Sequence, residues 1–246
     1  MEATGFKPAS LTDPKSKGTI TAIKFLLPFA LAFFATILFS TPAPASALQT
    51  ANAAPNLTAD FGVRQAMALD TSRLEKWTGA LARHEAALND DAECYNADAA
   101  FCFKTYWTEL VSELSTLSGA EQLTRVNSEI NRWSYRSDRA AWGRKDFWAT
   151  PQEMFDKGAG DCEDMAIFKY LLLRAVGFDA EDMTLMVMAT GTHAHMVLVV
   201  AQPGGAVVLD NLTNDILLAS DDDRTDVPIY SLSEAGWQML AVNKEG

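Results

Sequence analysis

Residues 158–177 read GAGDCEDMAIFKYLLLRAVG, a glycine-rich loop followed by an apolar run. From Met165 onward the residues are apolar on nearly every side of a helix, and Gly177 follows, as is typical of a buried helix that ends at a glycine. Cys162 lies at the start of this helix, directly after a glycine-rich loop. Unpaired, positively polarised N–H groups at a helix N-terminus favour thiolate over thiol. The stretch therefore predicts a central buried helix with a candidate nucleophile at its N-terminus.

The patterns on either side of this helix predict the remaining elements. Apolar residues at three-to-four spacing, starting near Leu74, Tyr106 and Leu123, indicate three helices, and a capping box at Thr150–Glu153 starts a short helix over 151–157. We expect a loop with short strands over 133–148. After the central helix the period changes to two, which predicts strands over 184–189, 194–200 and 206–210 and further strands near 228–232 and 237–242. The fold class is thus α+β, with an N-terminal helical layer and the central nucleophile helix packed on an antiparallel sheet.

The N-terminus has the composition of a secretory signal peptide. Basic residues precede a 15-residue apolar run, Phe25–Phe39, and small residues follow up to Ala47. We expect cleavage after Ala47; the alternative is an uncleaved anchor, although the run is shorter than the ~20 residues needed to span a membrane. Residues 48–57 are expected to form a flexible leader. Residues 58–246 then form a single domain, with a helical part over 58–120 and a catalytic core over 121–246.

Composition excludes two classes of protein. Hydrophobic residues make up 48% of the chain, and 20 basic against 32 acidic residues give a net charge of -12. A nucleic-acid-binding surface needs an excess of basic groups, and disordered chains have too few apolar residues to form a core. We therefore expect a globular protein that does not bind nucleic acid.

Export changes the interpretation of the three cysteines. Cys94 and Cys102 lie close together in a polar stretch, and cysteines in an oxidising compartment tend to pair. We expect a disulfide between them, with two free thiols as the alternative. Cys162 is then left over, and an unpaired thiol in an exported protein needs either burial or a task.

The three histidines offer candidate bases for this thiol. His84 lies in a surface-like helical pattern and is expected to be solvated. His193 and His195 lie at the head of one strand and share a face. A hairpin turn near 203–204 places Asp210 within one or two residues of His195, where a carboxylate can orient the imidazole. Alternation alone does not choose between His193 and His195, and a buried structural thiol at position 162 stays an alternative.

Carboxylates crowd the candidate nucleophile. Asp161, Glu163 and Asp164 all lie within two residues of Cys162. Their negative charge would raise the pKa of the thiol unless a positive group compensates it, and carboxylate oxygens suit Ca²⁺. In the alternative interpretation Asp161 is only the helix N-cap, with Asp164 in the first turn.

Several of these motifs together resemble the bacterial transglutaminase-like cysteine proteinases, the family of the LapG-type periplasmic adhesin protease. The resemblance covers about residues 120–215 and is carried by four segments: Asn131-Arg-Trp through Asp146-Phe-Trp-Ala-Thr-Pro-Gln-Glu-Met, Gly160-Asp-Cys-Glu-Asp-Met-Ala-Ile-Phe-Lys-Tyr, Ala194-His-Met-Val-Leu and Val208-Leu-Asp-Asn-Leu212. It implies a papain/transglutaminase-like fold with Cys162 as nucleophile, His195 as base and Asp210 as orienting carboxylate. It also implies calcium binding through Asp161 and Glu163.

The resemblance further implies a function. The expected activity is that of a periplasmic cysteine endopeptidase that cuts the N-terminal region of a large surface adhesin and so releases cells from a biofilm. The implied regulator is an inner-membrane receptor that senses cyclic di-GMP. Two alternatives stay open: acyl transfer to an amine, as in a transglutaminase or a cell-wall amide transferase, and a non-catalytic periplasmic binding module. In the latter, the acidic surface would recruit a partner and Cys162 would only be buried. An exposed aromatic patch could then form, although aromatic residues at this density are more often packed; its residues would be Trp133, Trp142, Phe147 and Trp148.

Overall fold

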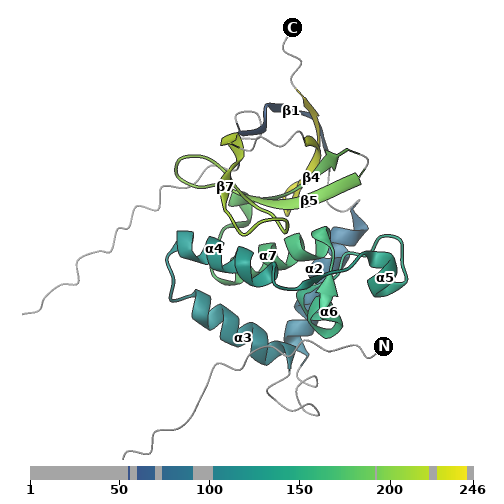
Figure 1. Ribbon diagram of the computed structural model, residues 1–246, viewed down its shortest axis with the longest axis vertical. Coiled ribbons are helices and arrows are strands. Elements are labelled where there is room, and N and C mark those ends of the chain that lie inside the picture. Colours follow the sequence, from purple (N-terminus) through teal and green to yellow (C-terminus); the bar gives the residue numbers. More distant parts are fainter. Residues whose placement is uncertain are drawn as a thin grey trace, which may run out of the picture. The chain divides into compact units, whose positions relative to one another are not determined.

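The computed structural model describes residues 55, 60–69, 74–90, 102–191, 193–221 and 226–242, all of which belong to one unit of the chain, Thr50–Gly246. The predicted signal peptide over 1–47 and the predicted leader over 48–57, apart from Pro55, lie outside the described residues. A layer of helices packs against one side of a curved antiparallel sheet (Figure 1). This arrangement confirms the predicted α+β class.

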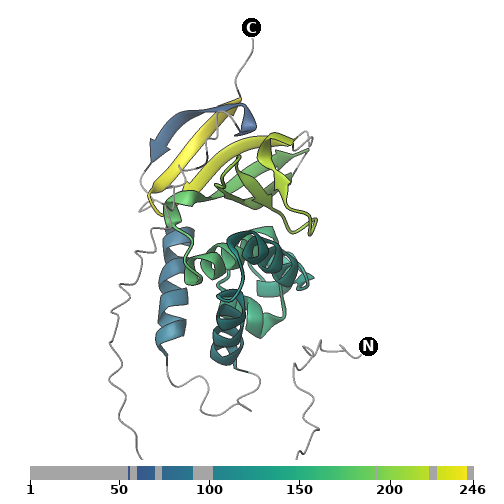
Figure 2. The same cartoon turned by 90° about the vertical axis from the view of Figure 1, so that its left-hand side faces the viewer.

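The sheet has seven strands in the order β1-β9-β8-β4-β5-β6-β7. Every neighbouring pair is antiparallel. Figure 2 shows the strands curving above the helices, with β1 and β9 farthest from them. The strand bounds are β1 Val63–Leu69, β4 Met183–Thr190, β5 His193–Val200, β6 Val207–Leu209, β7 Leu217–Leu218, β8 Val227–Ser233 and β9 Gly236–Val242.

The central strands are buried on both faces. In β5, Met196 and Leu198 pack in the core cluster formed with the helices, whereas Val197 and Val199 pack in a second cluster with Val63 of β1. Successive side chains of a strand point to opposite faces, so both faces of this strand meet apolar neighbours. This double burial explains why the sequence there is a nearly continuous apolar run.

The helices surround one buried helix, α7. Its residues are buried from Met165 to Leu173, and Tyr170 packs edge to face on Trp77 with ring centroids 5.2 Å apart. The helix bounds are α2 Glu75–Asn89, α3 Phe103–Leu114, α4 Gly119–Ile130, α5 Asp138–Trp142, α6 Pro151–Lys157 and α7 Cys162–Ala175, with 3₁₀ turns at Ala180–Asp182 and Ala219–Asp221. Within the described residues, no helix has the length and apolar character needed to cross a membrane.

Two segments differ from the sequence-based expectations. The expected helical part over 58–120 contains β1, an edge strand that pairs with β9 at the far end of the chain. The segment 133–148, expected to be a loop with short strands, does contain a short strand, β2, Ser134–Tyr135, which pairs in parallel with β3, Ala159–Gly160, but it also contains the helix α5, which was not expected. The strand β1 exists because it pairs with a distant segment, and local periodicity does not report such pairing.

The expectation that His84 is solvated was wrong. His84 is 6% exposed, and its ring packs edge to face on Trp107 at 4.9 Å. It follows Trp77 by seven residues, so both side chains lie on the same face of α2 and point into the core. Burial lowers the pKa of His84 to about 4, and its Nδ1 has no hydrogen-bond partner.

This buried imidazole should make folding sensitive to mild acid. Because the pKa of His84 falls from 6.5 to about 4 on folding, its contribution to stability is complete above pH 6.5 and is lost as the pH falls toward 4. The loss is on the order of 2–3 kcal/mol. We expect urea unfolding to show a larger drop in stability between neutral pH and about pH 4.5 for the wild type than for His84→Phe. Equal drops in the two proteins would contradict the assignment.

Candidate active site

Cys162 is the first residue of α7 and its thiol is free and 9% exposed. The thiol donates a hydrogen bond to Glu163 Oε2 at 3.0 Å. Burial and, secondly, the Glu163 carboxylate raise the pKa of the Cys162 thiol well above its usual range, while the backbone N–H of Met196 acts in the opposite direction. The sulfur therefore lies against β5, beside the residue that follows His195.

The carboxylate of Asp210 holds the imidazole of His195. His195 Nε2 and Asp210 Oδ1 are 2.8 Å apart, and the two side chains are 8% and 1% exposed. An ionised carboxylate only accepts hydrogen bonds, so Nε2 carries the proton and Nδ1 is the basic nitrogen. The β5–β6 register pairs Leu198 with Leu209, which places Asp210 within two residues of His195, in agreement with the hairpin geometry expected from the sequence. His193 is exposed at the start of β5.

A second buried charge lies near Asp210. Lys169 of α7 is 1% exposed and is seven residues after Cys162, on the same side of the helix. Burial lowers the pKa of Lys169 to about 7, and the charge of Asp210 offsets part of this effect. A buried carboxylate is costly unless it is compensated, and Lys169 supplies positive charge on the helix side of Asp210.

Two asparagines, Asn127 in α4 and Asn131 at its C-cap, hold the loop that carries Asp210. Asn131 Nδ2 donates to the backbone oxygens of Asp210 and Thr213, both at 2.8 Å, and to Asn214 Oδ1 at 3.1 Å. Asn127, one turn earlier, donates to the Thr213 oxygen at 3.0 Å. The backbone of the orienting carboxylate is thereby tied to the helical layer, across a sequence separation of 79 residues.

An acidic cluster lies beside the nucleophile. Asp138, Asp161 and Glu163 each present a carboxylate oxygen, and these oxygens lie within 4.8 Å of one another. One oxygen each of Asp138 and Asp161 is buried with no hydrogen-bond partner. Burial, followed by the charges of Glu163, Asp164 and Asp138, raises the pKa of Asp161 to about 9. Uncompensated buried carboxylates with free lone pairs are what a hard cation such as Ca²⁺ requires.

Asp164 has a structural place in this site. Its Oδ1 accepts from the Ala149 backbone N–H at 2.6 Å and its Oδ2 from the Asp161 N–H at 3.3 Å. Its side chain packs so closely on Gly160 that a Cβ there would lie 2.8 Å from the Cβ of Asp164. Asp161 is the N-cap of α7, as predicted by the alternative to calcium binding. It also carries one of the buried oxygens that have no hydrogen-bond partner.

Sequence reasoning missed Asp138, Asn131 and Lys169 as site residues. Asp138 is 23 residues before Asp161, and its backbone N–H donates to Asp161 Oδ2 at 3.2 Å. No spacing rule connects the two positions. Lys169 had a detectable signal, because a lysine in an otherwise apolar helix is rarely buried without a charged neighbour.

Cys102 is disulfide-bonded in the structure. Cys94, its predicted partner, lies outside the described residues.

The exposed aromatic patch of the binding-module alternative does not form. Trp148 is 5% exposed, and Trp133, Trp142 and Phe147 are half-buried. The Trp142 and Phe147 rings pack on each other with centroids 5.0 Å apart. These aromatic residues serve packing, as their density in the sequence favours.

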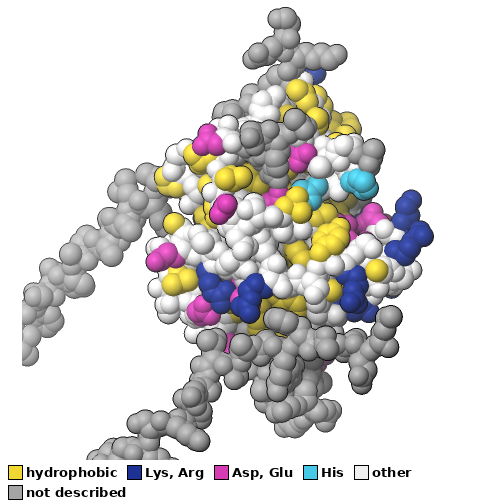
Figure 3. Space-filling model, in the orientation of Figure 1, with side chains coloured by type: hydrophobic (Ala, Val, Ile, Leu, Met, Phe, Trp, Pro, Cys, Tyr) yellow, Lys and Arg dark blue, Asp and Glu magenta, His cyan; other side chains and the backbone are white. Residues whose placement is uncertain are grey.

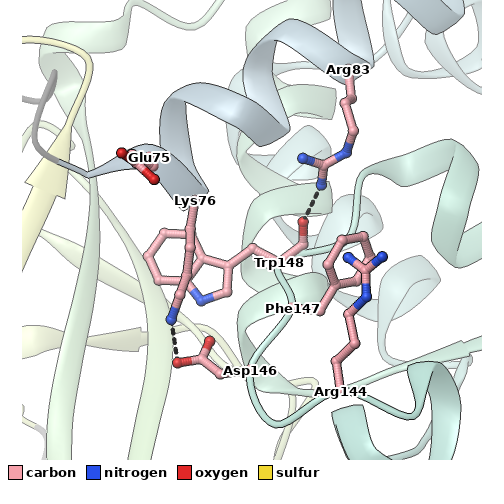
Figure 4. Close-up of a pocket in the computed structure, with 7 residues that line it drawn as sticks. All are labelled: Glu75, Lys76, Arg83, Arg144, Asp146, Phe147 and Trp148. Carbon is pink, nitrogen blue, oxygen red and sulfur yellow. Dashed lines mark hydrogen bonds and ion pairs between the residues drawn. The ribbon is translucent and has the colours of Figure 1, made fainter.

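A cleft of about 230 Å³ lies between α2 and residues 144–148 and contains no residue of the Cys162 site (Figure 4). Its charged groups are mostly engaged with the protein itself. Lys76 pairs with Asp146, and Arg83 donates to the Trp148 backbone oxygen at 2.7 Å and to Glu153 at 2.9 Å. These contacts join α2 to residues 144–148, the segment between α5 and α6.

Comparisons with known proteins agree with this geometry. The family model of the bacterial transglutaminase-like cysteine proteinases matches residues 93–244. Legionella pneumophila LapG is 33% identical over 63% of this chain and 86% of its own, with a TM-score of 0.53. The calcium-bound structure of the same protein is 30% identical and covers 65% of this chain and 87% of its own, with a TM-score of 0.50. The EGTA-treated structure is 33% identical and covers 63% of this chain and 84% of its own, with a TM-score of 0.53. None of the curated protein sequences matches the chain.

Loosening the loop that carries Asp210 should reduce turnover. We expect Asn131→Ala to lower kcat by on the order of 10- to 100-fold with little change in KM, because small displacements of a catalytic group are costly. Asn127→Ala is the matched control, since Asn127 contacts Thr213 but not Asp210. Steady-state kinetics on a peptide substrate, with thermal unfolding to verify the fold, measure the difference. Equal losses in both variants would show that the bond to Asp210 has no separate role.

Proposed function

Because this chain belongs to the bacterial transglutaminase-like cysteine proteinases, and is therefore a cysteine protease, we propose that it is an exported, calcium-dependent endopeptidase of the LapG type. In this proposal it uses Cys162, His195 and Asp210 and cuts the N-terminal region of a large surface adhesin. The observation that carries the proposal is the buried hydrogen bond between His195 and Asp210. His195 lies on β5, the strand against which the Cys162 sulfur lies.

In the proposed reaction, Cys162 transfers its proton to Nδ1 of His195, and the sulfur attacks the carbonyl carbon of the scissile peptide bond. The imidazolium then gives this proton to the leaving amine, and the carbonyl carbon stays on sulfur as a thioester. Water attacks the thioester, loses a proton to His195, and releases the carboxylic acid and the thiol. Asp210 keeps the imidazole in the reactive tautomer throughout and stabilises its positive form.

The charges around the thiol support a role for calcium. Burial and Glu163 oppose formation of the thiolate, and the oxygens of Asp138, Asp161 and Glu163 are arranged closely enough to bind one cation. A bound Ca²⁺ would supply positive charge that offsets these carboxylates. Asp161 and Glu163 were expected to be ligands from the sequence, and Asp138 joins them here. The calcium-bound structure of Legionella LapG supports the same choice of metal.

The location and partners of the enzyme complete the proposal. The basic, apolar and small-residue order of residues 1–47 favours export to the periplasm. A large adhesin is then the proposed substrate, and an inner-membrane receptor for cyclic di-GMP is the proposed regulator. A biofilm role follows if cleavage releases the adhesin from the cell surface.

The proposed triad makes a mutational prediction. Cys162→Ala, His195→Ala and Asp210→Ala should each lower kcat by on the order of 10⁴-fold or more while the protein stays folded. His193→Ala should retain most activity, because His195 is the histidine that Asp210 holds. The assay is cleavage of N-terminal adhesin fragments in calcium, followed by mass spectrometry.

Two outcomes of this assay would contradict the proposal. An essential His193 with a dispensable His195 would overturn the choice of base. Incorporation of a labelled amine in place of hydrolysis would show acyl transfer to an amine, the chemistry of a transglutaminase.

The metal assignment has a separate test. We expect EGTA to abolish cleavage and Ca²⁺, but not Mg²⁺, to restore it. Titration calorimetry on the Cys162→Ala variant should show Ca²⁺ binding that Asp138→Asn or Asp161→Asn weakens by at least ~10-fold, since each removes a charged ligand. Asp156→Asn, a change of the same kind in an exposed residue of α6, should have no effect. Full activity in EGTA, or binding that is indifferent to Asp138 and Asp161, would contradict the assignment.

A further inference from the structure

A group of exposed basic residues surrounds α5 in a protein whose net charge is -12. Figure 3 shows Lys and Arg side chains at the right-hand edge, where Figure 1 places α5. We name this group the α5 basic surface. It consists of Arg136, Arg139, Arg144, Lys145 and Lys157, all of which are exposed.

Within the described residues, these side chains have no acidic partner. None of the five forms an ion pair or donates a side-chain hydrogen bond there, whereas several other basic residues do form ion pairs, among them Lys76, Arg83, Arg125, Arg132 and Arg174. Arg144 and Lys157 instead lie over the rings of Phe147 and Trp142, at 4.7 and 5.2 Å. The rings hold these two cations in place and leave their charge free to act on a ligand.

The acidic residues nearby do not neutralise this surface. Asp138, the first residue of α5, is buried. Asp146 is paired with Lys76, and Glu153 with Arg83. Asp156 is the remaining acidic side chain of this segment, so the charge that the surface presents to a partner is positive.

The α5 basic surface is joined directly to the nucleophile. The Arg136 backbone N–H donates to the Gly160 oxygen at 2.9 Å, and Tyr135 pairs with Gly160 in the β2–β3 ladder, two residues before Cys162. Tyr135 is 63% exposed, and partial burial of its side chain, followed by the charges of Cys162 and Asp161, raises its pKa. A polypeptide bound at Cys162 and leaving the site over Tyr135 would therefore reach Arg136 and Arg139 next.

From this placement we propose that the α5 basic surface binds an acidic segment of the protein substrate that flanks the scissile bond. The inference rests on the proposed protease function and adds a determinant of specificity to it. Charge complementarity supports it, since an acidic segment would be repelled by most of this protein and attracted here. The charges are exposed, so each contributes modestly and the set acts together.

Kinetics with paired substrates test the inference. Two peptides share one scissile sequence, taken from a cleaved adhesin fragment, and carry either a Glu tract or a Gln tract of equal length on the same side. The wild type should have a KM several-fold lower for the Glu peptide, and this preference should fade with added salt. The double variant Arg139→Glu/Lys145→Glu should raise KM for the Glu peptide by on the order of 10-fold. Its kcat, and its KM for the Gln peptide, should stay unchanged.

Arg64→Glu is the matched control. Arg64 is exposed on β1 and forms no ion pair within the described residues, so the charge change is of the same kind at a different place. Equal KM values for the two peptides in the wild type, or the same loss in Arg64→Glu, would overturn the docking surface. Failure of the wild type to cut either peptide would count against the protease proposal instead. Fluorescence anisotropy then measures binding of both peptides to the Cys162→Ala variant, in which no turnover occurs. Equal affinity for the two peptides would refute the proposed docking of the acidic segment.

Discussion

The site depends on how the N-terminus of α7 is held inside the protein. Asp164 binds the backbone N–H groups of Ala149 and Asp161 and thereby joins the first turn of the helix to the segment that precedes α6. Gly160 permits this contact because any side chain there would collide with Asp164. Cys162 is consequently fixed with its sulfur against β5, the strand that carries His195, and Asp210 directly follows the neighbouring strand β6.

This arrangement concentrates buried charge, and the protein compensates each charge differently. Lys169 and two hydrogen bonds stabilise the carboxylate of Asp210. Asp138 and Asp161 are each left with a buried oxygen that has no hydrogen-bond partner, and burial, followed by the charges of neighbouring carboxylates, raises the pKa of Asp161. The same centre thus contains Asp210, whose charge the protein compensates itself, and the carboxylates of the acidic cluster, whose charge it does not compensate.

Part of this centre was predictable from local sequence. The glycine loop, Cys162 and the apolar helix after it follow a local pattern, and the short turn of the β5–β6 hairpin places Asp210 near His195 within a residue or two. Asn131 and Asp138 were not predictable, because each acts on a partner that folding brings close, 79 and 23 residues away. The prediction for His84 was wrong for a related reason. Its own helix looks amphipathic in sequence, but α3 covers the side that seemed exposed.

The sequence by itself determined the central helix with Cys162 at its start, most of the flanking helices and strands and the family of the chain, because these depend on residue types at short spacing. Only the tertiary structure decided which histidine the aspartate holds, which carboxylates lie close together and which basic residues of the described part of the chain lack ion pairs. Those properties are distances between side chains from different elements. Burial then sets how strongly the charges interact, since water is excluded at the nucleophile and present at the α5 basic surface.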